Sequence, residues 1–128
     1  MIEIGKLLNH RDLHDHAMSI ARACAQLSPS HVMNGYYTLC HGIAGVAHVF
    51  NRLYQATGDE VLRARAETYY DLLLVGYRPG TGIGGYSFRT NLASEQGNSD
   101  AERQAMEVDD ASFLTGSAGI GIALLAAV

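Results

Sequence analysis

A glycine frame that occurs twice is the feature that most constrains how this chain can fold. Gly42 and Gly45 stand in Leu39-Cys40-His41-Gly42-Ile43-Ala44-Gly45-Val46, and the spacing returns in Leu114-Thr115-Gly116-Ser117-Ala118-Gly119-Ile120-Gly121. Because glycine lacks a β-carbon, glycines at this spacing let neighbouring helices pack closely. The repeat predicts two equivalent helices, within residues 42–56 and 116–128, in a fold built from similar units.

Metal-binding side chains occupy only one copy of this frame. Cys40 and His41 precede Gly42, whereas Leu114 and Thr115 hold the corresponding places in the second copy. A thiolate and an imidazole are ligands that zinc prefers, but zinc sites usually take three or four protein ligands. Two interpretations therefore stand: a zinc site carried by one repeat, or a buried free cysteine beside a histidine that caps a helix.

Three segments together resemble a known family. Segment 39–45 resembles the zinc-binding Cys-His-Gly segment of the lanthionine synthetase C family, the lanthionine cyclases. Residues 49–54 and 58–59 are similar to the helix and turn that follow it, and residues 112–125 are similar to the family's last glycine-rich helix. The similarity extends over residues 12–128. It implies a bound zinc ion with Cys40 and His41 as two of its ligands.

The resemblance also implies a reaction. Cyclases of this family add cysteine thiolates of a precursor peptide to dehydroalanine or dehydrobutyrine, which forms the thioether rings of lanthipeptides (lantibiotics). The implied partners are the dehydrated precursor peptide and, as a further candidate, a dehydratase. The resemblance implies alternatives as well: a LanC-like protein that binds peptides as a scaffold without cyclising them, or a fragment without function.

The chain departs from the family pattern in ways that bear on activity. Family members are several times longer, and both their other zinc cysteine, in a Trp-Cys-Tyr-Gly-like segment, and their acid–base histidine lie upstream of the part represented here. We therefore expect residues 1–128 to form a single C-terminal portion of such a protein. Its zinc site would be incomplete, and the chain alone would be inactive as a cyclase.

Composition excludes several other classes. The sequence is 48% hydrophobic and 17% charged, which is typical of one globular unit rather than a disordered segment. The net charge of −4 does not indicate a basic surface of the kind that binds nucleic acid. Two cysteines do not make a disulfide framework, and no stretch has the pattern of a signal peptide or the length of a membrane span. We expect a cytoplasmic protein.

The apolar periodicity predicts an all-α fold. Helices are expected over residues 12–27, 43–56, 61–75 and 114–128, joined by loops that include a long glycine-rich segment, 77–110, with a short exposed helix near 101–106. Gly58 is predicted to end the second helix and Asp59 to cap the third, whose apolar residues fall in one register: Leu62, Ala66, Tyr69 and Leu73. Helix pairs with a glycine-rich inner member suit a partial α/α toroid of inner and outer helices. An open ring would leave an apolar edge exposed, which predicts poor solubility or self-association.

Several other residues invite a functional interpretation. Asp12 is predicted to cap the first helix, and Cys24 is expected in the core on that helix's apolar stripe. The histidines near the start of the helix are interpreted as solvated: His10, His14 and His16.

The other polar candidates lie near or after the glycine frame. His48 lies two turns, about 10 Å, beyond His41, which is too far for the two to share a metal. It is either an interior polar residue or a substrate-facing one. Of the two tyrosines before the frame, both predicted to pack, Tyr37 is the candidate to line the site. Gly82-Ile83-Gly84 only superficially resembles a phosphate loop, because no strand precedes it, and a flexible loop is the expected structure.

Overall fold

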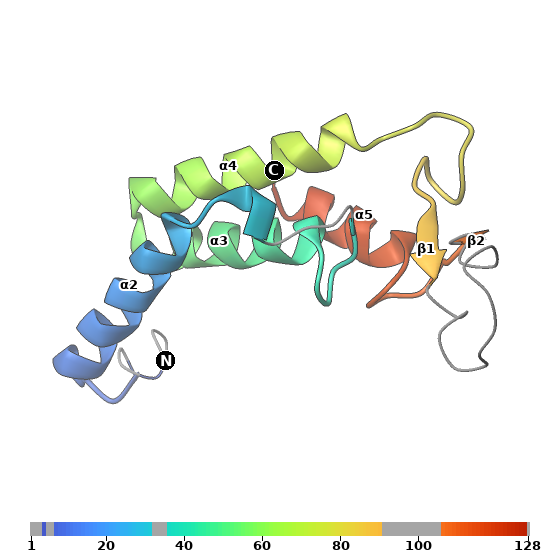
Figure 1. Ribbon diagram of the computed structural model, residues 1–128. Coiled ribbons are helices and arrows are strands. Elements are labelled where there is room, and N and C mark those ends of the chain that lie inside the picture. The colour runs from blue at the N-terminus through green and yellow to red at the C-terminus, as the bar shows by residue number, and fades with distance from the viewer. Residues whose placement is uncertain (1–3, 5–6, 32–35, 91–105, 128) are drawn as a thin grey trace, which may run out of the picture.

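The structure is a small helical assembly with one short strand pair. The computed structural model describes residue 4 and residues 7–31, 36–90 and 106–127. Its elements are α2 (Arg11–Ala25), the 3₁₀ turn η1 (Pro29–His31), α3 (Ile43–Thr57), α4 (Glu60–Val75), β1 (Phe88–Thr90), β2 (Met106–Val108) and α5 (Ser117–Leu125). The strands pair antiparallel over three residues each, and apart from this pair the described elements are helical, which agrees with the predicted all-α class (Figure 1).

Local sequence signals determine how α3 turns into α4. Gly58 adopts the left-handed conformation that ends α3, with φ 69°, and its amide donates to the Tyr54 carbonyl at 2.7 Å. Asp59 then caps α4, because its carboxylate accepts from the Val61 amide at 2.9 Å. This two-residue turn sends α4 back along α3, and the predicted cap is confirmed (Figure 1).

The core lies mainly between α3 and α4. The apolar stripe predicted for α4 is buried as expected, at Leu62, Ala66, Tyr69 and Leu73. On α3, Ala44 and Ala47 are fully buried, and the ring of Phe50 is buried as well. The Phe50 and Tyr69 rings stack with centroids 6.1 Å apart. Small alanine side chains on α3 allow the two helices to pack closely, because they keep little volume between the backbones.

Helices α3 and α5 begin in the same way, as the repeated glycine frame predicts. Gly42 and Gly116 precede them with nearly identical backbone angles, φ −120° and ψ −175° against φ −118° and ψ −170°. In each copy the first helical amide donates to a carbonyl seven residues upstream: Ile43 to Tyr36 at 3.0 Å, and Ser117 to Asp110 at 2.8 Å. The two helices run side by side in the same direction (Figure 1). Parallel inner helices are consistent with part of a toroid, which itself stays a prediction.

Helix α2 differs from its predicted boundaries and burial. It begins at Arg11 with His10 as the cap, since the Leu13 amide donates to His10 Nδ1 at 3.3 Å, so the assignment of the cap to Asp12 was wrong. Cys24 is exposed, so its assignment to the core was also wrong. Helix α2 packs on α4, and its buried residues form one stripe along the helix: Ala17, Met18, Ala21 and Ala25.

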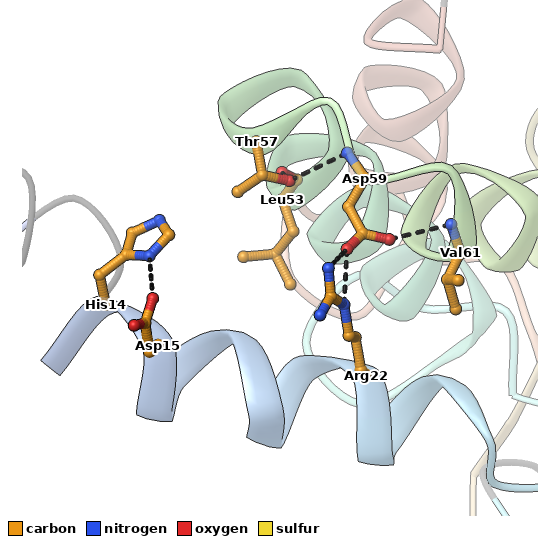
Figure 2. A network of polar contacts seen from close by, with 7 residues as sticks. All are labelled: His14, Asp15, Arg22, Leu53, Thr57, Asp59 and Val61. Atoms are coloured by element: carbon orange, nitrogen blue, oxygen red, sulfur yellow. Dashed lines mark hydrogen bonds and ion pairs between the residues drawn. The ribbon is translucent and has the colours of Figure 1, made fainter. Parts of the chain in front are cut away.

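An ion pair fastens α2 to the α3–α4 turn (Figure 2). Arg22 contacts Asp59 Oδ2 through Nη2 at 2.6 Å and through Nε at 2.7 Å. The Asp59 side chain is only 7% exposed, and the hydrogen bond from Arg22 holds the pKa of this carboxyl below its usual range. Of the histidines on this helix, His16 is exposed, as the solvated interpretation expects, whereas His14 is half-buried beside Asp15.

An apolar surface remains uncovered on several helices. It includes Leu125, which is 76% exposed, and Ile122 on α5, together with further large side chains elsewhere: Ile20, Leu27, Val49, Val61, Leu74 and Val75. The apolar edge expected of an open ring stays a prediction. None of the described helices combines the length and apolar character needed to cross a bilayer.

Candidate metal centre

The Cys40–His41 pair lies on a loop that folds back over the first turn of α3. The Gly45 amide donates to the Thr38 carbonyl at 3.3 Å, and the Leu39 carbonyl passes directly over Gly45. A β-carbon at Gly45 would meet that carbonyl oxygen, and one at Gly42 would meet the Thr38 backbone. The glycines of the frame are therefore required for the close approach that carries the loop to the start of the helix.

The two predicted ligands converge. Cys40 Sγ and His41 Nδ1 lie 2.6 Å apart, both side chains are exposed, and both lie just before the N-terminal end of α3. The positive end of the helix dipole faces this point, which favours an anionic ligand such as a thiolate. The exposed position rules out the alternative of a buried free cysteine at Cys40.

Tyr36, rather than Tyr37, is the aromatic neighbour of the pair. Its ring centroid lies 5.7 Å from that of His41. Tyr37 instead packs against Tyr86, with centroids 5.5 Å apart, and against the backbone at Gly76, so the prediction that it packs is confirmed.

The pair fits zinc in the type of its donors and only partly in their number. Tetrahedral coordination at ordinary Zn–S and Zn–N lengths would place the sulfur and nitrogen about 3.5 Å apart. Binding would thus require the two exposed side chains to separate by about 1 Å, a small rotation for groups in solvent. Within the described ranges, no group of three or more His, Cys, Asp and Glu side chains comes together to complete such a site.

Comparison with known proteins assigns the chain to a family. A family model described as "Lanthionine synthetase C-like protein" matches residues 1–128. The chain belongs to this family. Comparisons with curated proteins and with solved structures gave no significant match. The lanthionine synthetase C-like assignment therefore rests on the family model, and it agrees with the Cys-His-Gly segment and the glycine frame.

The second copy of the frame forms hydrogen bonds with the loop that carries the pair, a contact that could not be predicted from the sequence. The Leu39 and Cys40 amides both donate to the Leu114 carbonyl, at 3.2 and 3.0 Å. Leu114 occupies the place of Cys40 in the repeat, so aligning the two copies pairs the residue that accepts these hydrogen bonds with the residue that donates one of them. A backbone contact leaves no side-chain signature, however, and nothing in the sequence says that the two copies touch there.

Two other candidates lie away from the pair. His48 is half-buried on α3, and its Nδ1 atom is buried with no hydrogen-bond partner in the described part of the chain. Its role, interior or substrate-facing, stays a prediction. Gly82-Ile83-Gly84 lies between α4 and β1, so it lacks the strand–loop–helix order of a phosphate site. The Ile83 carbonyl there accepts from Ser117 Oγ at 2.6 Å, which ties this loop to the start of α5.

The long segment after α4 is only partly described. The short helix expected near 101–106 falls outside the described residues except at Met106, which begins β2. That strand was not predicted, because its partner, Phe88–Thr90, lies far away in the sequence.

Proposed function

We propose that this chain is the zinc-bearing part of a lanthionine cyclase that forms thioether rings in lanthipeptides. The observation that carries the proposal is the convergence of Cys40 Sγ and His41 Nδ1 at 2.6 Å on an exposed loop, in a chain of the lanthionine synthetase C-like family. We propose Cys40 as a thiolate ligand and His41 as an imidazole ligand.

The chemistry follows from an open metal site. When bound, zinc would lower the pKa of a peptide cysteine and hold it as a thiolate near neutral pH. The peptide sulfur then bonds to the β-carbon of dehydroalanine or dehydrobutyrine, and a proton goes to the α-carbon. The proton donor expected for this family is a histidine outside this chain.

The remaining roles belong to residues around the pair. Exposure of Cys40 and His41 leaves room for a peptide chain to reach them, and the Tyr36 ring flanks the His41 imidazole. The proposed partner is a dehydrated precursor peptide, supplied by a dehydratase that removes water from Ser and Thr. A cytoplasmic location would keep the Cys40 thiol reduced.

One observation favours a second candidate for the isolated chain. The described residues supply two ligands, Cys40 and His41, and no third acidic, histidine or cysteine side chain joins them. A site with two protein ligands would hold zinc weakly. The chain on its own would then be an inactive part of a larger cyclase, or a peptide-binding scaffold that does not cyclise.

Elemental analysis of the purified chain tests the proposal. We expect far less than one zinc per molecule, and Cys40→Ala should remove whatever remains because it deletes the thiolate. Cys24→Ala is the matched control, since Cys24 is the other exposed cysteine and lies on α2, outside the site.

Two results would count against parts of the proposal. Equal zinc in wild type and Cys40→Ala would remove Cys40 from the metal site. Stoichiometric zinc that resists a chelator, or ring formation on a dehydrated peptide by this chain alone, would contradict its incompleteness.

A further inference from the structure

A single carbonyl of the second glycine frame holds the backbone of the ligand-bearing loop. The Leu114 oxygen accepts hydrogen bonds from the Leu39 amide at 3.2 Å and from the Cys40 amide at 3.0 Å. A carbonyl has two lone pairs, so both bonds can form at once. Because the Cys40 amide is attached to the same Cα as the thiol-bearing side chain, fixing that amide limits where Sγ can lie.

Side chains next to that carbonyl form hydrogen bonds with one another. The Leu114 carbonyl belongs to the peptide group that joins Leu114 to Thr115, and the Thr115 hydroxyl donates to Asp110 Oδ2 at 2.7 Å. Asp110 Oδ1 accepts from the Ser112 amide at 2.7 Å, and the Ser112 and Thr115 hydroxyls lie 2.8 Å apart. The three polar residues thus close a small network around the peptide that faces Cys40.

The two copies use corresponding positions in different ways. Asp110 and Thr115 occupy, in the second frame, the places of Tyr36 and His41 in the first. The first pair brings an aromatic ring beside an imidazole, at 5.7 Å, whereas the second pair forms a hydrogen bond inside the loop. Hydrogen bonds from Ser112 and Thr115 also lower the pKa of Asp110, so its carboxylate stays an acceptor at neutral pH.

We propose that Asp110 and Thr115 are positioning residues for the Cys40–His41 pair and act through the Leu114 carbonyl. Their effect on metal binding rests on the proposed function, whereas their effect on the loop does not. The second copy of the frame, which lacks metal ligands, would thereby hold the loop of the first copy, which carries them, in position. Residues that orient metal ligands from outside the coordination sphere typically change metal affinity by about 10–100-fold when removed.

Residue-level amide exchange on the full chain tests the positioning role directly. In Thr115→Val, which keeps the shape but loses the hydroxyl, the Leu39 and Cys40 amides should exchange about tenfold faster. Thr115→Ser should restore the wild-type rates, and Asp110→Ala should reproduce the valine variant. Thr68→Val is the matched control, because the Thr68 hydroxyl donates to Ala64 on the surface of α4, away from the loop.

The amides of α4 separate positioning from general stability. If exchange at Leu39 and Cys40 is unchanged in Thr115→Val, the proposal is wrong. If the acceleration extends equally to buried amides of α4 such as that of Leu73, or the variant fails to fold, Thr115 stabilises the whole chain and the positioning role is also wrong. Faster exchange confined to the Leu39–Cys40 loop supports it.

Cobalt(II) binding provides the second measurement and separates this inference from the proposed function. We expect the thiolate-to-cobalt absorption of wild type to require about tenfold more cobalt in Thr115→Val, and Thr115→Ser to recover the wild-type titration. If wild type and Cys40→Ala give the same titration, the metal function fails, while amide exchange at Leu39 and Cys40 still decides the positioning role. If Cys40 binds cobalt and Thr115→Val titrates as wild type does, the link from Thr115 to the metal is wrong.

Discussion

Two glycines in one helix should respond in opposite ways to the same substitution. Gly119 and Gly121 both lie inside α5, two residues apart. A β-carbon on Gly119 would meet the Phe113 carbonyl oxygen and would lie 2.8 Å from Leu39 Cβ, whereas one on Gly121 would meet no atom within 4 Å. Gly119→Ala is therefore an overpacking change at the contact between the two frames, and Gly121→Ala is a change into open space.

The magnitude can be worked out from these contacts. Alanine in place of glycine stabilises a helix interior by about 0.5–1 kcal/mol, and both variants gain this term. Gly119→Ala also suffers the overpacking cost of about 1–3 kcal/mol, because one of the atoms it meets is backbone and cannot rotate away. The helix-propensity terms cancel in the comparison, so the two variants should differ by about 1–3 kcal/mol in unfolding free energy.

Urea denaturation followed by circular dichroism measures this difference. Gly121→Ala should raise the midpoint and Gly119→Ala should lower it, with similar slopes. In a chain of this size, about 1 kcal/mol corresponds to about 4 °C in melting temperature, so thermal melts provide a second measurement. If both variants shift the midpoint equally and in the same direction, the close approach of the frames at Gly119 does not constrain the fold.

Two further predictions concern charge and the uncovered surface. The pKa of Asp59 lies below its ordinary value of 3.8 in the folded chain, because Arg22 donates to its carboxylate, so the stability it contributes is complete well above pH 3.8 and is lost as the pH falls through the folded pKa. Asp59→Asn keeps the helix cap but removes that charge. When the pH is lowered from 7 into the acid range, the unfolding free energy of this variant should therefore fall less than that of wild type. An equal fall in both proteins would refute the argument. The apolar face of α5 should make the chain self-associate with rising concentration in sedimentation velocity, and Leu125→Lys should reduce this, whereas a wild-type monomer at every concentration would contradict it.

Features fixed by neighbouring residues could be predicted from the sequence. The Gly58-Asp59 turn and the buried stripe of α4 came out as expected, because a left-handed glycine, a capping carboxylate and a helical period act within a few residues. Cys24 shows the limit of this reasoning. It lies on the apolar stripe read from the sequence, but other residues form the buried face of α2, so tertiary context decides which apolar residues are buried.

In the candidate site, too, local features could be predicted and features that depend on tertiary contacts could not. The convergence of Cys40 and His41 could be predicted because the residues are adjacent in sequence and precede a helix. The neighbouring ring could not, since Tyr36 and Tyr37 are chemically identical and only the folded loop separates their environments. The β1–β2 pair was missed because its strands are short and distant in sequence, and pairing between distant strands leaves little local pattern to recognise.

The repeated frame explains why one copy can lack ligands and still matter to the site. In both copies the second glycine lets a carbonyl fold back over the helix start, at Leu39 above Gly45 and at Phe113 above Gly119. Each loop is thereby held at the same height on its helix, and because α3 and α5 lie side by side, the Leu114 carbonyl of one loop comes within hydrogen-bonding distance of the Cys40 amide of the other. A threonine suits the second copy because its short hydroxyl reaches Asp110 within the loop. In the first copy an exposed imidazole occupies that place and contacts Cys40 and the Tyr36 ring, whereas in the second copy the hydroxyl forms hydrogen bonds with side chains of its own loop.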